Sequence, residues 1–474
     1  MNRPKILRIL LFVILLSKSQ IEAQQVILSP EIDLRSDFAY YLIPLAKDVV
    51  LIRDKAVKVI FQKLDSNLNW STERELQLEG KKWNILDAYQ HNNNIGIIYT
   101  CRIDKIIQCY YTVFDNAGNK KYHRNLIDTL AIQSNENISF QSSENKNFVS
   151  VGFRDFQSNP YVFVYERFQD SIYYVKNVKE IFNFNNGFAE EAIVTNQGEL
   201  YLKAIERNPI KSKIKYIHKI IGANSQGEKI MYKVIESEFE FFSSKLSYRT
   251  STNQICFVGL CQEAGETEMI GYAIQNLSKN EPIRFTEFDE KKIKEWTGRK
   301  NNNIYSNNNL QLRNVKFQED GSAVIFIESV KQYLRRPYFG GANDGTPAFA
   351  GSRWIDYYFD DVLVSCIRED GVKNWETILR KKQFSQDDEG INSSFFIMNN
   401  RSFLRILFND EIKNESTVSE YILLADGKVN RKSILNTSFK KINLRIRDAI
   451  QIDAQSVLIP SENNGRLSLL RMIL

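Results

Sequence analysis

Apolar and polar residues alternate in short runs along most of the chain, and residues that favour tight turns separate the runs. The first two runs are residues 48–53 and 56–64, which lead into Asp65-Ser66-Asn67. Asp, Asn and Gly supply the side-chain-capped or positive-φ conformations of tight turns. Short runs rich in Val, Ile, Tyr and Phe between such turns are typical of strands. The pattern therefore predicts a succession of β-hairpins.

The same pattern continues to the C-terminus. Further turn signals occur at 115–118, 196–198, 264–265, 320–321, 370–371 and 426–427. Residues 290–300 alone predict a helix, and aromatic residues make up 12% of the chain. We therefore predict an all-β protein.

The spacing of the turn signals predicts how the strands are grouped. Asp65 and Asp115 lie about 50 residues apart, as do Asp320 and Asp370, and Asp426 follows after a similar interval, which is the length of one four-stranded β-propeller blade. Units of this size predict a β-propeller. We predict seven blades, and six or eight blades are also compatible with the spacing. A closed ring also explains the absence of a Pro-rich or Gly/Ser-rich linker, because each blade buries its faces against its neighbours. The alternative is two β-sandwich domains with a boundary within residues 276–310, where the strand rhythm is interrupted.

The N-terminus has the pattern of an export signal. Arg3, Lys5 and Arg8 precede the apolar run 9–16, and no acidic residue occurs before Glu22. The run is shorter than the ~20 residues that cross a bilayer, so it is typical of a cleaved signal peptide rather than an anchor. We predict a signal peptide over residues 1–23 and a single mature domain over 24–474. The mature chain is then exported to a periplasm or the extracellular space, without a transmembrane segment.

The charge gives little support to a nucleic-acid partner. The formal net charge is +6, and removal of residues 1–23 takes away four positive charges and one negative charge, which leaves about +3. The remaining charges are interspersed, without the basic block and interleaved aromatics that nucleic-acid binding requires. We therefore expect a protein or glycan partner rather than nucleic acid.

The five cysteines raise the question of disulfides in an exported chain. Cys101 and Cys109 flank a predicted hairpin turn, and a turn centred near Lys105 places them opposite each other, where a cross-strand bridge is possible. Two buried free thiols are the alternative. Cys256 and Cys261 lie in one predicted strand at an odd spacing, so they point to opposite faces and do not pair with each other.

One segment carries a resemblance to a known family. Residues 368–376 (REDGVKNWE) resemble the G-x-x-x-W end of pyrroloquinoline-quinone-type propeller blades, in which the Trp docks between blades. More broadly, residues 310–440 resemble exported bacterial propeller-like proteins without an assigned activity. In those proteins a strand ending in Glu precedes an aromatic loop, a strand like 357–361 (YYFDD) and the turn before the Trp. The resemblance implies fold and compartment, and it brings no catalytic residues.

The strongest candidate site is a long insertion, residues 335–356, between two predicted strands. Loops of this length are often functional, particularly when a rigid scaffold holds them. Its aromatic side chains are suited to stacking on a sugar or covering an apolar patch of a partner, and its arginines to binding an acidic group. The predicted binding residues are Arg335, Arg336, Tyr338, Phe339, Phe349, Arg353 and Trp354.

Signals for catalysis are weak by comparison. The adjacent acids Asp360-Asp361 and Glu190-Glu191 point to opposite faces of their strands, and the three histidines share no motif. We find no hydrolase, metalloprotease or phosphate-binding motif and predict no cofactor and no metal site. We therefore favour a binding scaffold that uses loops on one face of the ring over an enzyme. The alternative is a carbohydrate-active hydrolase with carboxylates from different blades converging at the central channel.

Overall fold

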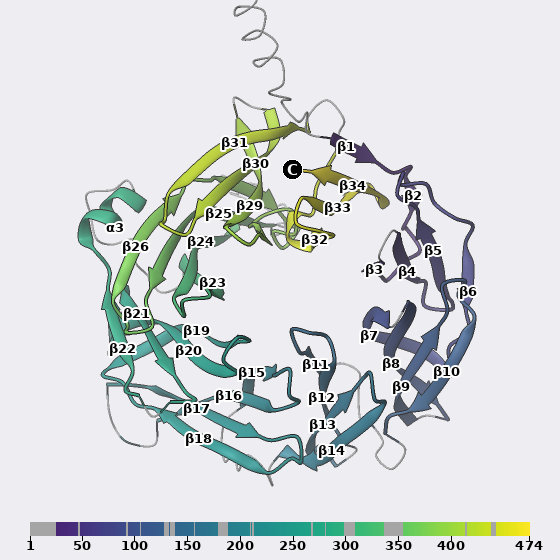
Figure 1. The fold of residues 1–474 in the computed structure, drawn as a ribbon, viewed down its shortest axis with the longest axis horizontal. Helices are drawn as coiled ribbons and strands as arrows, with labels where there is room; N and C mark the ends of the chain where they lie inside the picture. The colour runs from purple at the N-terminus through teal and green to yellow at the C-terminus, as the bar shows by residue number, and fades with distance from the viewer. Residues whose placement is uncertain are drawn as a thin grey trace, which may run out of the picture.

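The strands form eight antiparallel sheets, seven of which are built from strands that follow one another along the chain. The sheets are arranged as a ring, and in each of these seven sheets the first strand lies towards the centre (Figure 1). This computed structural model describes residues 25–45, 48–91, 93–104, 106–127, 132, 138–155, 157–178, 188–208, 210, 213–266, 269–279, 281–297, 309–335, 354–412, 415–437 and 442–474. The fold is an all-β β-propeller, as predicted, and its eight blades lie within the predicted range of six to eight, one more than the favoured number of seven.

Blades 1 to 7 each contain four consecutive strands, which we call A to D from the centre outwards. Blades 1 to 4 consist of β3 (Ala39–Pro44), β4 (Val49–Asp54), β5 (Val59–Leu64) and β6 (Arg74–Leu76); β7 (Lys81–His91), β8 (Asn94–Ile103), β9 (Ile106–Phe114) and β10 (Lys120–Asn125); β11 (Ser139–Ser142), β12 (Phe148–Arg154), β13 (Pro160–Glu166) and β14 (Ser171–Asn177); and β15 (Phe188–Val194), β16 (Leu200–Arg207), β17 (Tyr216–Ala223) and β18 (Lys229–Ile235). Blades 5 to 7 consist of β19 (Phe239–Arg249), β20 (Gln254–Glu263), β21 (Met269–Asn276) and β22 (Arg284–Glu287); β23 (Leu310–Phe317), β24 (Ala323–Arg335), β25 (Trp354–Ile367) and β26 (Lys373–Leu379); and β28 (Phe396–Asn399), β29 (Phe403–Ile412), β30 (Glu415–Leu424) and β31 (Val429–Asn436).

Two further elements lie between blades. Helix α3 (Glu290–Thr297) joins blade 5 to blade 6, in the segment where the sequence predicts a helix, and β27 (Gln383–Gln386) follows blade 6 and pairs with β25. Among the described residues, no helix combines the length and the apolar character that a membrane span requires.

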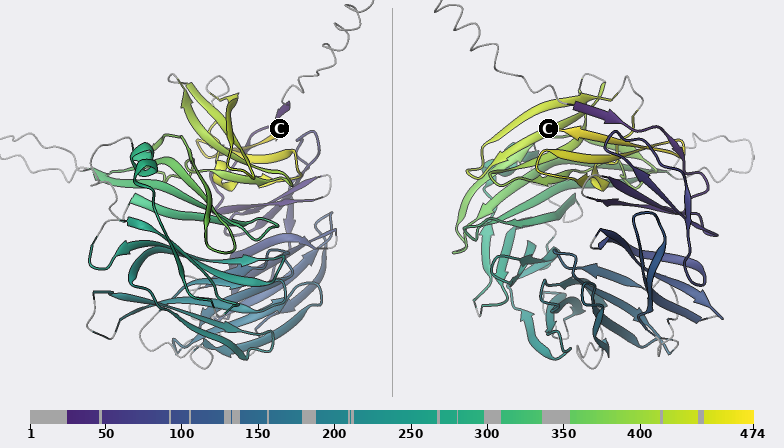
Figure 2. Two further views of the ribbon diagram at one scale, coloured as in Figure 1. Left: turned by 60° about the vertical axis from the view of Figure 1, so that its left-hand side comes forward. Right: turned by 45° about the vertical axis from the view of Figure 1, so that its right-hand side comes forward.

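Blade 8 closes the ring by joining the two ends of the described chain. Its inner strands come from the C-terminal region: β32 (Ile450–Gln451), which follows the short 3₁₀ helix η4 (Ile446–Asp448), β33 (Ser456–Asn463) and β34 (Arg466–Ile473). Its outer strands, β1 (Gln25–Leu28) and β2 (Ile32–Asp33), both pair antiparallel with β34. Figure 2 shows the purple β1 beside the yellow C-terminal strands. The last strand of the chain therefore pairs with strands near the N-terminus, and this pairing closes the ring.

The hydrophobic core is divided among the boundaries between blades. Eight clusters of buried apolar side chains each join two neighbouring blades, and together they run around the whole ring. The cluster between blades 8 and 1 packs Leu51 and Leu64 against Leu458 and Leu469. Each blade therefore depends on both neighbours for the burial of its faces.

The predicted turns owe their shape to side chains that cap the backbone. Asp65 Oδ1 accepts hydrogen bonds from the backbone N–H groups of Asn67 and Asn69, at 2.9 and 2.8 Å. Asp115 and Asp155 bond in the same way to the second and fourth residues after them. An Asp at the first position of a turn can satisfy two backbone donors. Asp320, Asp370 and Asp426 lie at the third position of their turns, where each accepts a hydrogen bond from one backbone N–H.

Of the two possibilities for Cys101 and Cys109, the structure has buried free thiols rather than a cross-strand bridge, and all five cysteines are free and buried. The β8–β9 hairpin pairs Cys101 with Gln108 and Thr100 with Cys109. Residues one position out of register point to opposite faces of a sheet, so the two sulfur atoms lie in different cores. Cys101 packs between blades 1 and 2, and Cys109 packs between blades 2 and 3.

Candidate functional site

Two strands of blade 6 extend well beyond the rest of their sheet. Strands β24 and β25 have 13 and 14 residues. Strand β23 pairs with β24 as far as Ser329, and β26 pairs with β25 only from Val362 onwards. Beyond these points β24 and β25 continue as a hairpin, and β27 adds a third strand. We call residues 330–335, 354–359 and 383–386 the arm of blade 6.

The two faces of the arm differ in character. Directly paired residues of neighbouring strands share one face. One face packs Val330, Ile355, Tyr357 and Phe359 into a small apolar cluster. We call the opposite face the aromatic face; the register places on it Lys331, Tyr333, Arg335, Trp354, Asp356, Tyr358, Phe384 and Gln386.

The aromatic face presents large rings to solvent. Tyr333 is 53% exposed and Phe384 is 56% exposed. Half-buried Tyr358 lies between them, with ring centroids 5.7 Å from Tyr333 and 5.1 Å from Phe384. The ring planes are inclined at 77° and 47°, so the face is uneven rather than a flat platform. Contiguous exposed apolar surface on a folded protein commonly marks an interaction site.

The charged groups on and beside this face are matched in pairs. Arg335 forms an ion pair with Asp356, whose Oδ1 also accepts a hydrogen bond from Gln386 Nε2 at 3.2 Å. Hydrogen bonding to Tyr358 and the charge of Asp356 raise the pKa of Arg335 above its ordinary value. Lys331 Nζ lies 3.2 Å from the Asp360 carboxylate. The aromatic face thus combines apolar rings with little net charge.

A buried polar cluster holds the base of the arm to the ring. Glu328 is fully buried, with Lys381 Nζ 2.7 Å from its Oε1 and Arg313 Nε 2.5 Å from its Oε2. Lys381 also donates hydrogen bonds to Phe359 O and Gln383 Oε1, each at 2.9 Å. Burial lowers the pKa of Lys381, and the charge of Glu328 opposes that effect. Since Gln383 begins β27, this cluster fixes the third strand of the arm against the second.

The structure brings together two of the predicted site residues. Arg335 and Trp354 are register partners at one end of the arm. The other predicted residues, Arg336, Tyr338, Phe339, Phe349 and Arg353, lie outside the described part of the chain. Tyr333, Tyr358 and Phe384 on the aromatic face are not among the site residues predicted from the sequence. The unusual length of the two strands flanking the insertion is the signal that points to Tyr333 and Tyr358.

A cavity of about 550 Å³ near blades 8, 1 and 2 bears on the hydrolase alternative, because four carboxylates line it. Each of them is bonded to an arginine. The pairs are Asp37 with Arg53 (2.6 Å), Asp87 with Arg167, and Asp448 and Glu462 with Arg445 (2.6 and 2.7 Å). These ion pairs occupy carboxylate oxygens that a glycosidase directs at its substrate.

The other acid and histidine groups form no recognisable catalytic set. Asp360 pairs with Lys331 while Asp361 pairs with Arg380, as expected for neighbours on opposite faces of a strand. His218 Nδ1 lies 3.4 Å from Ser244 Oγ, but its buried Nε2 has no hydrogen-bond partner within the described ranges, where a catalytic triad has a carboxylate. The described residues also contain no group of three or more His, Cys, Asp or Glu side chains placed to hold a metal ion.

Comparisons with known proteins give only distant structural similarities. No protein-family model matches the chain, and no curated protein matches it. The WD40 domain of SCAP from fission yeast is 8% identical with a TM-score of 0.42, over 95% of this chain and 98% of that one. The β-propeller domain of Nup133 from Vanderwaltozyma polyspora is 11% identical with a TM-score of 0.40, over 96% and 99%. Prolyl oligopeptidase B from Galerina marginata is 9% identical with a TM-score of 0.40, over 93% of this chain and 55% of that one. The eight sheets of the chain itself assign it to the all-β β-propellers.

Proposed function

We propose that this chain is an exported β-propeller that binds a protein partner through the aromatic face of the blade 6 arm. The observation that carries the proposal is the pair of exposed rings Tyr333 and Phe384 with half-buried Tyr358 between them. Arg335 and Trp354 lie at the end of this set. Tyr, Trp and Arg are enriched among the residues that dominate binding energy at protein interfaces. The ring acts as the rigid scaffold that presents this face.

The geometry of the rings favours a protein over a glycan. Sugars stack on flat aromatic faces, whereas the Tyr333 and Tyr358 planes are inclined at 77°. An uneven apolar surface suits the interdigitating side chains of a protein interface, which pack as closely as a protein interior. A glycan ligand is therefore the outcome that would overturn this part of the proposal.

Export is the second part of the proposal. Its support is the basic and apolar pattern of residues 3–16. Cleavage after Ala23 is compatible with the ring, because the ring-closing strand β1 begins at Gln25. The mature propeller would then act in a periplasm or outside the cell. A fusion of residues 1–30 to a reporter enzyme tests this part, and retention of the uncleaved reporter in the cytoplasm would contradict it.

Photocrosslinking tests the binding surface. Residues 24–474 would carry the photoreactive amino acid p-benzoylphenylalanine at Phe384 or, as the matched control, at Tyr232, which is a similarly exposed aromatic on blade 4. Both proteins would be irradiated with the exported protein fraction of the source cells. We expect a discrete protein adduct from position 384 that position 232 does not give.

A purified partner then allows the affinity to be measured. The double variant Tyr333→Ser/Phe384→Ser should weaken binding at least 10-fold. The control Phe168→Ser/Tyr232→Ser, which removes two exposed aromatics elsewhere, should leave it unchanged. Equal affinity of the two variants, or the same adducts from both positions, would overturn the proposal. A glycan-array signal that the first variant loses would replace the protein partner with a glycan.

A further inference from the structure

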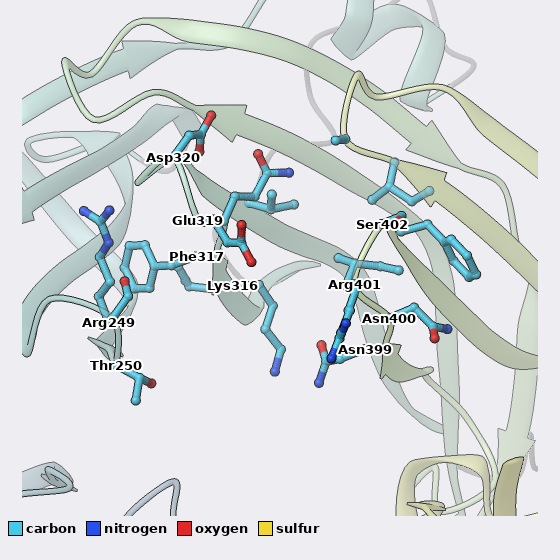
Figure 3. A pocket seen from close by; sticks show the side chains of 18 of the residues that line it. Arg249, Thr250, Lys316, Phe317, Glu319, Asp320, Asn399, Asn400, Arg401 and Ser402 are labelled. Atoms are coloured by element: carbon cyan, nitrogen blue, oxygen red, sulfur yellow. The ribbon is translucent and has the colours of Figure 1, made fainter. Parts of the chain in front are cut away.

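The end of the ring that carries the A–B turns has a cavity of about 860 Å³ between blades 6 and 7 (Figure 3). Its lining includes charged side chains of both signs: Glu144, Glu319, Asp320, Arg249, Lys316 and Arg401. Three carboxylates against three cations select neither an acidic nor a basic ligand. The opposite end of the ring, where the arm continues from the B–C side of blade 6, carries a more specific feature.

Strand β24 has a free edge along the arm. One side of β24 pairs with β25 throughout residues 330–335, whereas on the other side β23 pairs with it only as far as Ser329. No strand among the described residues pairs with that other side beyond Ser329. Residues 332–335 are all exposed, and Leu334 is 54% exposed. We call the unpaired side of residues 330–335 the free edge of β24.

Hydrogen bonds on β25 show which backbone groups point to the free edge. The carbonyl oxygen of Ile355 accepts a bond from the N–H of Asp387 at 3.0 Å, and the Ile355 N–H donates to Asp387 Oδ1 at 2.8 Å. Both backbone groups of Ile355 thus point away from β24. Because Ile355 is the register partner of Leu334, the two form a non-hydrogen-bonded pair, and the N–H and C=O of Leu334 point away from β25. The two kinds of pair alternate along an antiparallel ladder, so the backbone groups of Gln332 point the same way.

The free edge lacks the devices that usually protect an edge strand. Natural sheets cover or shorten their edges, or interrupt them with Pro, bulges or charges. Residues 330–335 contain no Pro and keep a regular register with β25. Their two cations, Lys331 and Arg335, are ion-paired with Asp360 and Asp356. An added strand would therefore meet neither a kink nor an unmatched charge.

We propose that the partner binds the arm by strand addition, in which an extended segment of the partner pairs with the free edge of β24. Its backbone exchanges hydrogen bonds with the outward N–H and C=O groups of Gln332 and Leu334. In this mode of peptide recognition the main-chain hydrogen bonds supply affinity. Strand addition rests on the proposed function, since it states how that partner contacts the arm.

The side chains beside the free edge define the chemistry of the added segment. Tyr333 lies between the two outward-pointing residues, so its pair with the added strand is non-hydrogen-bonded, and the side chains of such pairs approach most closely. Aromatic and β-branched residues stabilise a pair with a tyrosine. The residue opposite exposed Leu334 lies on the other face and has to be apolar to cover it. The partner segment therefore carries an aromatic or β-branched residue next to an apolar one, with no requirement for charge.

Fluorescence polarisation with two strand-forming peptides tests the pairing. The first probe is a fluorescein-labelled octapeptide, Lys-Thr-Val-Tyr-Ile-Val-Thr-Lys. The second has the same side chains, but the peptide nitrogens between its terminal lysines are methylated and cannot donate hydrogen bonds. We expect residues 24–474 to bind the first probe about 10-fold more tightly than the second, the effect of two or three lost hydrogen bonds. Equal affinity for the two probes, or no binding of the first, overturns the proposal.

A proline at position 334 locates the pairing. Leu334→Pro removes an N–H that points away from β25, and Pro is tolerated on an edge strand where its nitrogen faces solvent. This variant should weaken binding of the first probe about 10-fold, whereas Leu334→Ala, which keeps the N–H, should weaken it only about 2–3-fold. Equal affinity of the two variants would mean that the probe does not pair with this edge.

Hydrogen exchange measured by mass spectrometry examines the edge without a substitution. In the free protein the amide hydrogens of Gln332 and Leu334 should exchange faster than those of Lys331 and Tyr333, which bond to β25, and the first probe should slow them. Slow exchange at Gln332 and Leu334 in the free monomer would mean that the chain already pairs with its own edge. Slow exchange in a dimer, identified by sedimentation, would make a second copy of the chain the occupant. Either result overturns the proposal.

The outcome is separable from that of the proposed function. With the purified partner, Tyr333→Ser/Phe384→Ser tests the aromatic face, and the comparison of Leu334→Pro with Leu334→Ala tests the edge. A partner that loses affinity for the first variant but binds the two position-334 variants equally would uphold the aromatic face and overturn strand addition. Absence of an adduct from position 384 would instead overturn the proposed function.

Discussion

Trp375, on the outer strand of blade 6, donates its indole N–H to the carbonyl oxygen of Ala425 in the C–D turn of blade 7, at 2.8 Å. Other blades repeat this arrangement with other donors. Lys176 bonds to Gly227 O and Arg284 to Glu369 O, in each case from an outer strand to the next C–D turn. These bonds fasten neighbouring blades at the rim, where the apolar clusters between them end.

The contact between Trp375 and Gly427 leads to the first prediction. Gly427 has φ +83°, and a Cβ there would lie 2.6 Å from the indole ring. Gly427→Ala should lower the free energy of unfolding through both backbone strain, about 1–3 kcal/mol, and this overlap. Gly265→Ala is the matched control, because Gly265 has φ +89° with no atom within 4 Å of the added Cβ. Urea unfolding should give a clearly larger loss for Gly427→Ala, and equal losses would contradict close packing at this boundary.

Ring closure leads to the second prediction. Strand β34 pairs with β33, β1 and β2, so it links the N-terminal segment to the rest of blade 8. Deletion of residues 466–474 should destabilise the whole molecule in one cooperative transition, because an open ring leaves the faces of blades 7 and 1 without partners. Removal of residues 1–23, which precede β1, should leave the melting temperature unchanged. A truncated protein that melts like the full ring would contradict closure through β34.

The strands and turns could be predicted from the sequence because they depend on local chemistry. The number of blades could not. Asp65 and Asp115 are both C–D turns of successive blades, but Asp320 and Asp370 are the A–B and C–D turns of a single blade, separated by two strands and the insertion. At both kinds of turn an Asp side chain accepts a hydrogen bond from a backbone N–H group, as Asp320 and Asp370 show. Turn spacing alone therefore mixes distances between blades with distances within a blade.

Only part of the site could be predicted from the sequence, because only part of it depends on residues that are close together in the chain. Arg335 and Trp354 end the two strands that flank the insertion, so the insertion pointed to them directly. Phe384 reaches the same face because β27 adds to β25 after an entire intervening strand. The pairing of β27 with β25 depends on the Glu328–Lys381 cluster at the base of the arm. No local sequence pattern predicts this cluster.

The cysteines lead to the third prediction. A difference of one residue in the strand register decides whether Cys101 and Cys109 can form a disulfide. The β8–β9 pairs Cys101–Gln108 and Ile103–Ile106 centre the turn between residues 104 and 105, not on Lys105. Burial raises the pKa of Cys101 to about 12 and that of Cys366 to about 11. All five thiols should therefore resist a thiol-specific reagent at pH 8 in the native protein and react once denaturant is added. A Cys101–Cys109 disulfide in mass spectra would mean that this register is wrong by one residue.

The base of the arm gives the fourth prediction. Glu328→Gln leaves the Lys381 ammonium buried without its ion-pair partner, which typically costs about 3–5 kcal/mol. Lys381→Met should cost less, because Glu328 keeps its ion pair with Arg313. Glu328→Gln/Lys381→Met removes both charges and should lose less stability than the sum of the single variants in urea unfolding. Additive losses would show that the two groups do not interact. Because Lys381 also bonds to Gln383, the single variants should expose the arm to proteolysis before the ring unfolds.

The last prediction concerns acid stability and His218. Burial and the nearby Lys203 ammonium lower the pKa of His218 to about 4 in the folded protein, from an ordinary value of 6.5. Glu191, the other charged group in this cluster, lies 3.1 Å from Lys203. Between these two pKa values the unfolded chain binds a proton that the folded chain does not, so the free energy of unfolding should fall as the pH drops from about 6.5 to about 4. At 1.36 kcal/mol per pH unit the contribution approaches ~3 kcal/mol.

His218→Leu should flatten that part of the profile, because it removes the proton-binding group while keeping an apolar side chain against Phe241 and Phe257. His123→Gln is the control. Burial also lowers the pKa of His123, but this residue is only half-buried and forms a 2.8 Å hydrogen bond between its Nδ1 and Thr112 Oγ1. Urea unfolding at several pH values between 4 and 7.5 should show the acid-dependent loss in the wild-type protein and in His123→Gln, but not in His218→Leu. An unchanged slope in His218→Leu would mean that carboxylates, which titrate at lower pH, account for the acid sensitivity instead.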